Sequence, residues 1–256
     1  MQVKRLEAVF DHPLIERRGR GICLTREGEQ LLSYGRRIIK LNDEAWQRMT
    51  HEDFQGQVSL GVPEDLIGAL IPTIMRDFGT AYPMASIHLA TTGTRKLKVQ
   101  LNEKTLDVIL TTEALDEATG ECLYKAPMRW FTGADSQIYA KRPLPLAYHL
   151  GCIFMPYAVH ALDSVGITWQ RPYDADDWRD LSTFVSAGLA VQATMANIRK
   201  HDWHEVPSHA GLPSLPDFGV FMYIREDAPE LALQLAGFIR DEYYMLGPQK
   251  LKAVMA

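Results

Sequence analysis

Hydrophobic residues at the start of the chain follow a helical pattern that soon gives way to a hairpin pattern. Apolar residues recur at helical spacing from Val3 to Phe10, and Pro13 ends this segment. Short apolar runs at 14–15 and 22–24 then flank residues 17–21, which comprise three arginines and two glycines. The pattern predicts a short helix followed by two strands around a glycine-containing turn.

A long amphipathic helix is expected next, over about residues 27–49. Thr25 is well suited to cap its N-terminus, and acidic residues lie in its first turn. We expect its apolar seam to pair with a second copy of the chain, although a helix packed on the body of its own chain is the alternative. Polar residues 51–57 form a hinge after it. The seam has heptad spacing and comprises Leu31, Tyr34, Ile38, Leu41 and Ala45.

From residue 58 onward, expected strands alternate with expected helices. Strands are predicted at 58–62, 85–93 and 106–112, and helices at 63–83 and 94–104. The first of these helices has a proline near its start and a glycine near its end. The β-α-β-α-β order predicts a parallel sheet.

A second series of similar elements follows, after which the chain returns to the first. The pattern predicts an apolar segment at 143–149, a helix at 153–165, a strand near 168, a helix at 175–187, an apolar segment at 189–194, a strand at 218–224 and a closing helix at 228–246. The fold class predicted from this order is α/β, with two lobes.

The composition is that of an ordinary globular protein, because 46% of the 256 residues are hydrophobic and 23% are charged. No apolar run approaches the roughly 20 residues of a membrane span, and the N-terminus lacks the apolar region of a signal peptide. We therefore expect a cytoplasmic protein that does not contact membranes. Cys23, Cys122 and Cys152 form no CxxC pair, which favours reduced thiols over disulfides.

Positive charge is concentrated at the N-terminus. The first 40 residues contain nine Lys and Arg against five acidic residues, although the whole chain has a net charge of −5. This asymmetry favours an anionic partner such as a phosphate backbone, and a solvated basic surface is the alternative.

Motifs of catalysis and of metal binding are missing from the sequence. It contains no GxSxG, no HExxH and no phosphate-binding glycine loop, so an enzyme is not expected. The spacing of His201, His204 and His209 matches no standard zinc site. We expect no metal and no cofactor.

The N-terminal segment resembles the end of the winged helix-turn-helix of LysR-type transcriptional regulators. In that family a recognition helix precedes a wing with the pattern L-F-x-R-x-x-R-x-x-x-L-T-x-x-G, then a linker helix and a two-lobed effector domain like periplasmic binding proteins. The resemblance covers essentially the whole chain. The residues that match the wing pattern are Leu14, Ile15, Arg17, Arg20, Leu24, Thr25 and Gly28.

The resemblance implies three parts of the chain. Residues 1–26 would be a partial winged helix-turn-helix, 27–50 the linker and dimerisation helix, and 56–256 the effector-binding domain. Within that domain, lobe I would comprise about 58–126 and 212–256, and lobe II about 127–211.

DNA contacts are expected from the N-terminal helix and the wing. A helix can read bases in the major groove, while arginines on a hairpin reach phosphates or the minor groove. Because Met1 falls inside the expected recognition helix, we expect the sequence as given to bind DNA weakly or not at all, with the full gene product as the DNA-binding form. The candidate DNA-binding residues are Gln2, Lys4, Arg5, Arg17, Arg18 and Arg20.

The resemblance places the effector between the lobes, and ligands of parallel α/β lobes bind at the carboxyl ends of strands. Glu64 and Asp65 stand where family members that bind carboxylates typically have Ser or Thr, which favours a cationic, neutral or amphipathic effector. Capping of a helix is the alternative role of these acids. A buried inert thiol is favoured at Cys152 over a redox switch. The candidate effector-binding residues are Pro63, Glu64, Asp65, Thr91, Thr92, Thr111, Thr112, Cys152 and Ile153.

The function implied is a DNA-binding transcriptional regulator of the LysR type, controlled by a small-molecule effector. The expected assembly is a homodimer whose dimers pair into tetramers. The alternative is a dimeric small-molecule-binding module without DNA-binding activity.

Overall fold

The computed structural model describes residues 2–18, 21–50, 55–68, 70–175 and 178–254. The side chains of residues 18, 21, 22, 36, 37, 40, 43–50 and 246–254 lie outside this description. The chain forms two compact units, Met1–Phe54 and Gln55–Ala256.

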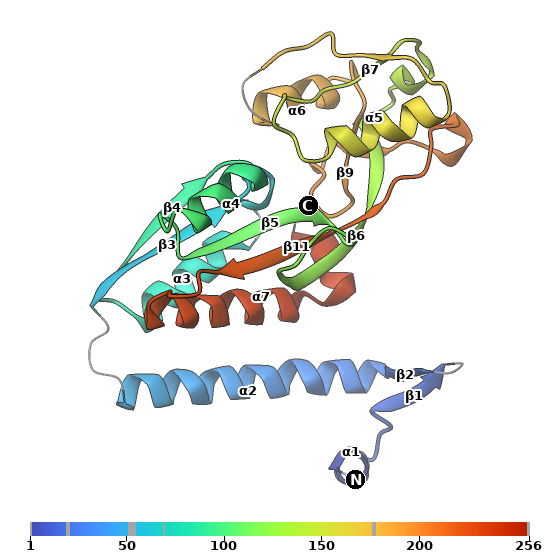
Figure 1. The fold of residues 1–256 in the computed structure, drawn as a ribbon. Helices are drawn as coiled ribbons and strands as arrows, with labels where there is room; N and C mark the ends of the chain where they lie inside the picture. The colour runs from blue at the N-terminus through green and yellow to red at the C-terminus, as the bar shows by residue number, and fades with distance from the viewer. Residues whose placement is uncertain (1, 19–20, 51–54, 69, 176–177, 255–256) are drawn as a thin grey trace. The chain divides into compact units, whose positions relative to one another are not determined.

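The N-terminal unit contains two helices and a hairpin (Figure 1). Helix α1 (Gln2–Phe10) precedes strands β1 (Ile15–Arg18) and β2 (Gly21–Leu24), which pair antiparallel, and helix α2 (Arg26–Thr50) follows. These elements agree with the expected helix, hairpin and long helix.

Local hydrogen bonds attach the hairpin to both helices. Thr25 caps α2 by accepting a hydrogen bond from the Gly28 N–H at 3.0 Å, and its own hydroxyl donates to the Pro13 carbonyl at 2.6 Å. A Cβ atom on Gly28 would lie 1.9 Å from the Leu14 carbonyl oxygen. Glu7 of α1 accepts the Leu14 N–H at 2.8 Å. The Thr and Gly of the wing pattern therefore have a structural role here.

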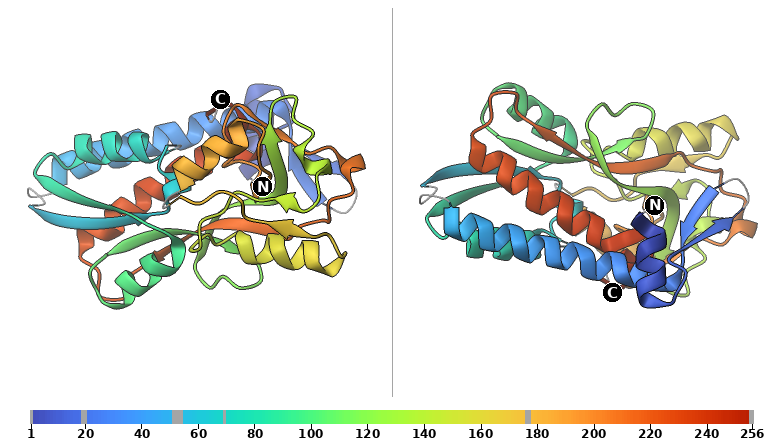
Figure 2. Two further views of the ribbon diagram at one scale, coloured as in Figure 1. Left: turned by 90° about the horizontal axis from the view of Figure 1, so that it is seen from above. Right: turned by 90° about the horizontal axis from the view of Figure 1, so that it is seen from below.

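Lobe I of the second unit is built on three parallel strands. Strand β3 (Gly56–Val62) lies between β4 (Ala85–Thr91) and β5 (Val108–Ala114). Helix α4 (Thr94–Asn102) covers one face of this sheet, and α3 (Ile71–Ala81) and α7 (Glu230–Val254) lie together on the other (Figures 1 and 2). The predicted parallel β-α-β-α-β order is confirmed.

The long strand β6 (Glu121–Gly133) passes from lobe I into lobe II. Its first half pairs antiparallel with β11 (Asp217–Ile224), which itself pairs with β5, so the chain returns to lobe I as expected. Its second half pairs with β9 (Gln192–Met195) and β10 (Trp203–Glu205) of lobe II. The hinge is therefore defined by β6 and β11 where Pro127 lies opposite Asp217. The other elements of lobe II are β7 (Leu144–Pro145), α5 (Met155–Ser164), β8 (Trp169–Gln170) and α6 (Trp178–Ser186).

Two predicted helices differ most from the structure in their bounds. The helix expected at 63–83 is a short 3-10 turn, Glu64–Leu66, followed by α3 from Ile71. Pro72 lies in the first turn of α3, where its missing N–H costs nothing, so the helix begins beside it. Helix α7 continues to Val254 instead of ending at residue 246. Strands β6 and β10 were not predicted.

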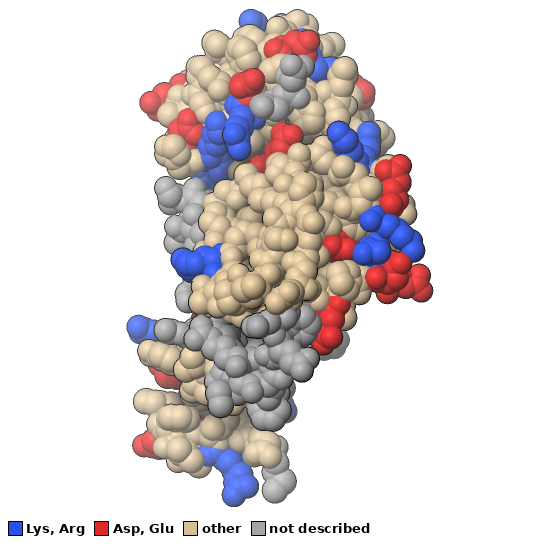
Figure 3. Space-filling model, turned by 90° about the vertical axis from the view of Figure 1, so that its left-hand side faces the viewer, with Lys and Arg blue, Asp and Glu red and all other residues tan. Residues whose placement is uncertain are grey.

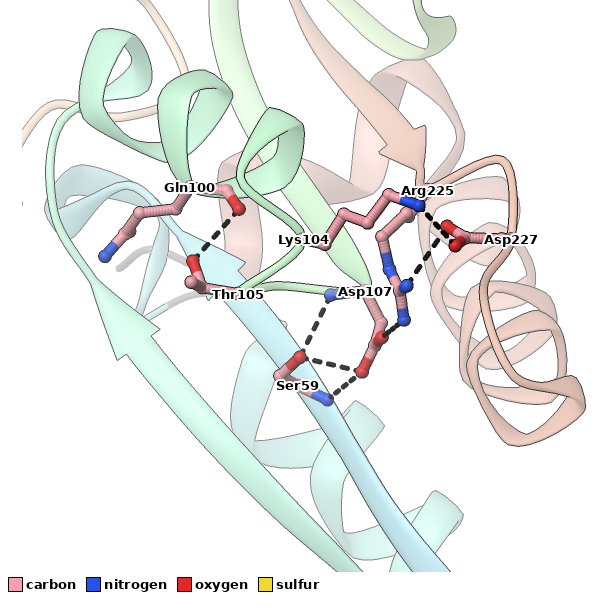
Figure 4. Close-up of polar contacts among 7 residues, drawn as sticks. All are labelled: Ser59, Gln100, Lys104, Thr105, Asp107, Arg225 and Asp227. Atoms are coloured by element: carbon pink, nitrogen blue, oxygen red, sulfur yellow. Dashed lines mark hydrogen bonds and ion pairs between the residues drawn. The ribbon is translucent and has the colours of Figure 1, made fainter.

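Hydrogen bonds and ion pairs connect lobe I's sheet to the end of β11 (Figure 4). They involve the side chains of Ser59, Lys104, Asp107, Arg225 and Asp227. Asp107 accepts hydrogen bonds from the Ser59 N–H at 2.8 Å and the Ser59 hydroxyl at 2.7 Å. Arg225 contacts Asp107 at 2.5 Å and Asp227 at 3.0 Å, and Lys104 contacts Asp227 at 2.6 Å. These contacts connect β3, β5, β11 and the start of the turn before α7.

Candidate functional site

A cavity lies between the two lobes at the carboxyl ends of the parallel strands. Lobe I contributes the residues that follow β3, the start of α4 and the end of β5. Lobe II contributes the turn before α5 and the start of α6. The cavity is lined by Pro63, Glu64, Asp65, Gly93, Thr94, Thr112, His149, Gly151, Cys152, Ile153, Phe154 and Trp178.

The lobe I wall is held together by two buried threonines. The Thr94 hydroxyl accepts the Thr112 N–H at 3.1 Å, and the two hydroxyl groups are 3.4 Å apart. Thr94 is 5% exposed and Thr112 is 1% exposed. This contact fixes the N-terminus of α4 against the end of β5.

Two acidic residues lie side by side on this wall. Burial raises the pKa of Asp65 from 3.8 to about 7, the Asp65 backbone N–H opposes this effect, and the Glu64 carboxylate adds to it. The described lining residues include no Lys or Arg. Both acids lie in the first turn of a short 3-10 helix, and α3 begins only at Ile71.

The lobe II wall is a tight turn followed by helix α5. His149 accepts the Gly151 N–H through Nδ1 at 3.2 Å, and its carbonyl accepts the Cys152 N–H at 3.1 Å. Burial raises the pKa of the Cys152 thiol to about 12, although the N–H groups of Phe154 and Met155 oppose this effect. The thiol therefore stays protonated at neutral pH, as expected for a buried inert cysteine.

The candidate effector residues fall into two groups. Pro63, Glu64, Asp65, Thr112, Cys152 and Ile153 meet at the cavity. Thr91, Thr92 and Thr111 do not line it, and Thr111 is fully buried on the other face of β5, where its hydroxyl donates to Glu113 at 2.6 Å.

The other residues that line the cavity were not predicted individually. Gly93 and Thr94 follow β4, a parallel strand, and His149, Gly151 and Phe154 precede α5, but none of them was selected as a candidate. Trp178 was missed, since nothing in the sequence relates the start of α6 to lobe I.

The candidate DNA-binding residues all belong to the N-terminal unit. Gln2, Lys4 and Arg5 are exposed on α1, and Arg17 is exposed on β1. Arg20 and the side chain of Arg18 lie outside the described residues. No residue of α1 is buried, and Val9 on its apolar face is 76% exposed.

The candidate dimerisation seam follows one side of α2. Tyr34, Ile38 and Leu41 are 52%, 67% and 66% exposed, and Leu31 is half-buried. The side chain of Ala45 lies outside the description. In the part of Figure 3 that shows the second unit, Lys and Arg are mixed with Asp and Glu around a broad uncharged area.

Comparison with known families identifies this architecture. The model of the LysR substrate binding domain matches residues 51–243. The chain belongs to the LysR family. It is 28% identical over 217 residues to the HTH-type transcriptional regulator PecT of Dickeya dadantii, a match that covers 84% of this chain and 69% of that protein. It is 27% identical over 253 residues to the regulator DgdR of Burkholderia cepacia, with 96% and 84% covered.

Solved structures show the same fold. A full-length, single-residue variant of OxyR from Pseudomonas aeruginosa is 17% identical, with a TM-score of 0.55 and coverage of 94% of this chain and 88% of that chain. Full-length BenM is 16% identical, with a TM-score of 0.58 and coverage of 96% and 87%. Both support the two-lobed, periplasmic-binding-protein-like α/β class.

The LysR chain is thus a transcriptional regulator with an effector-binding domain, and not an enzyme. Regulators of the LysR family bind DNA and small-molecule effectors and are commonly oligomeric. Among the helices that the structure describes, none combines the length and the apolar character that crossing a membrane requires.

Proposed function

We propose that this LysR regulator binds DNA through α1 and the β1–β2 hairpin, and that a cationic or neutral small molecule between its lobes controls it. The observation that supports the effector class is the pair of acids, Glu64 and Asp65, on a wall without a lysine or arginine among its described lining residues. A carboxylate effector would be repelled there, whereas an ammonium group would gain a partner. Arg95 is a cation whose charge reaches the Cys152 thiol in the same cavity. Its effect, which lowers the pKa of that thiol, is the smallest of those that act on it.

Three probes with one ring and different charges test the effector class. Benzylamine, benzyl alcohol and benzoate are titrated by calorimetry at pH 8, where Asp65 is ionised. We expect benzylamine to bind at least about tenfold more tightly than benzoate, which corresponds to about 1.4 kcal/mol. Asp65→Asn should remove most of that preference. Tighter binding of benzoate to the wild-type protein would contradict the proposed class.

Binding of a cation should also depend on pH. Below the pKa of about 7 Asp65 is protonated in the free cavity, so a cation must displace a proton before it pairs with the carboxylate. We expect the dissociation constant of benzylamine to rise as pH falls from 8 to 6, and to change much less in Asp65→Asn. The same affinity at both pH values would exclude Asp65 as its partner.

Arg17 of β1 tests the DNA contact. In the full gene product, which is the expected DNA-binding form, Arg17→Ala should weaken binding of genomic DNA fragments and reduce the slope of log affinity against log salt by about 1, because one phosphate contact is lost. Arg76→Ala, an exposed substitution in the second unit, is the matched control and should leave the slope unchanged. Equal slopes for the two variants would contradict a DNA contact at Arg17.

We also propose that α2 pairs with its counterpart in a second copy of the chain, and that the resulting dimers associate into tetramers. Seam residues three and four apart lie on one stripe of the continuous helix. Ile38→Glu should shift the mass measured by light scattering toward the monomer. Ile39→Glu, which is similarly exposed at 61% but lies off the seam, should not. If both variants have the wild-type mass, the seam is not the interface.

A further inference from the structure

The first turn of α5 connects the cavity to the hinge between the lobes. Phe154, the residue that precedes α5, lines the cavity. Its ring lies 5.1 Å from that of Phe218 on β11, between centroids. One helical turn later, the ring of Tyr157 meets the same Phe218 edge to face at 5.0 Å. We call Phe154, Tyr157 and Phe218 the aromatic wedge.

Phe218 lies at the point where the two lobes join. It is fully buried, and it pairs with Ala126 of β6 and with Ala114 of β5. The next pair toward lobe II, Asp217 and Pro127, is the last between β11 and β6. Beyond it, β6 pairs with strands of lobe II alone. A ring that packs against Phe218 therefore packs against the hinge.

The far end of the wedge also lies near lobe I. Burial raises the pKa of Tyr157, the nearby carboxylates of Glu117 and Asp116 raise it further, and Arg95 opposes these effects. Glu117 belongs to the turn between β5 and β6, where its N–H donates to the Ala114 carbonyl at 3.2 Å. Tyr157 is thus a lobe II side chain whose ring packs on the hinge strand β11 and whose hydroxyl lies near acidic residues of a lobe I turn.

We propose that the aromatic wedge sets the orientation of the lobes and transmits occupancy of the effector cavity to it. Tyr157 and Phe218 are positioning residues, and Phe154 is the member that an effector touches. An effector that displaces the Phe154 ring must move Phe218 or lose the contact, since packed aromatic rings tolerate little displacement. This role rests on the proposed effector site for its trigger, whereas the mechanical link exists without any ligand.

Hydrogen exchange of the whole ligand-free chain tests the mechanical link. Tyr157→Leu removes the ring contact and the hydroxyl, so we expect amides of hinge peptides around 124–128 and 215–219 to exchange at least about tenfold faster, with α3 and α7 unchanged. Tyr173→Leu is the matched control, because Tyr173 stacks on Phe184 at 4.3 Å within lobe II and does not cross to lobe I. Unchanged hinge exchange in Tyr157→Leu, or equal acceleration throughout the chain, would overturn the proposal.

A second pair of variants separates the wedge from the cavity itself. Phe154→Leu should accelerate the same hinge amides as Tyr157→Leu, whereas Ile153→Val, an adjacent change in the cavity lining, should not. Equal effects of both variants would show that any change of the cavity reaches the hinge and would overturn a specific role of the wedge. Because no ligand is used, this result is independent of the probe titrations, and either proposal can fail alone.

Discussion

Replacing Asp107 with alanine should lower the free energy of unfolding by about 3–5 kcal/mol, the range observed when one partner of a buried, hydrogen-bonded ion pair is removed. Asp107 is 8% exposed and holds Ser59 of β3 and Arg225 at the end of β11 through the contacts of Figure 4. The substitution leaves the Ser59 groups without this acceptor, and it leaves the Arg225 guanidinium with Asp227 but without its contact to Asp107. Chemical denaturation at pH 7 measures the loss.

Asp227→Ala provides the matched control. Asp227 also pairs with Arg225 and with Lys104, but its side chain is 53% exposed, so water replaces much of the lost interaction. We expect a much smaller cost than at Asp107. Equal costs at the two positions would show that burial does not amplify the Asp107 interactions. In the double variant with Arg225→Met, the cost should be smaller than the sum of the single costs, because the two residues act as one unit.

The pH dependence of this contribution has a defined sign. Burial raises the pKa of Asp107, but the hydrogen bonds from Arg225 and Ser59 outweigh it, and the pKa is lowered overall from 3.8. The stabilisation is therefore present above about pH 4 and is lost as pH falls through the lowered pKa. The difference between wild type and Asp107→Ala should shrink in acid.

Local sequence patterns were sufficient to predict the helices and strands whose formation depends on neighbouring residues. The helix, hairpin and capped helix at the N-terminus, and the three parallel strands of lobe I, follow from periodicity and from Thr25 as a cap. Strand β6 was missed because its polar positions, Lys125 and Arg129 among them, interrupt both an apolar run and a regular alternation. Its two halves serve different sheets, so no single face pattern extends along it.

The site was predictable to the level of strand ends but not of individual side chains. Thr111 and Thr112 are adjacent and equally polar, yet they point to opposite faces of β5, and only Thr112 faces the cavity. Which face of β5 points to the cavity depends on where α4 packs, and the packing of α4 is a tertiary property that the local sequence does not determine. Trp178 reaches the cavity because lobe II folds over lobe I, which leaves no signal in the neighbouring sequence.

The second large effect concerns Asp65, and here neutralisation should stabilise the protein. The pKa of about 7 in the folded chain lies above the ordinary 3.8, so the folded state retains a proton that the unfolded state has released. Stability contributed by this group therefore falls as pH rises from about 4 to 7, and the full penalty is present above 7. The penalty at pH 8 is up to about 4 kcal/mol.

Asp65→Asn should recover much of that penalty, because asparagine occupies the same volume without a charge to bury. We expect the free energy of unfolding to rise by a few kcal/mol at pH 8 and by less than half as much at pH 5, as measured by chemical denaturation without ligand. Tyr243 of α7 and Cys152 face Asp65, and both thiol and phenol are uncharged over this range, since the pKa of each is raised.

Glu64→Gln is the control, since it removes the adjacent carboxylate from the same 3-10 turn. It should change stability less than Asp65→Asn does at pH 8. A destabilising effect of Asp65→Asn at pH 8 would mean that the ionised carboxylate has a partner that outweighs its burial. The charge of the acidic wall would then already be compensated within the protein, and the unpaired charge that a cationic effector needs would be missing. A stabilising effect would instead show that the regulator maintains an unfavourable charge in its cavity, as binding sites that compromise stability for function commonly do.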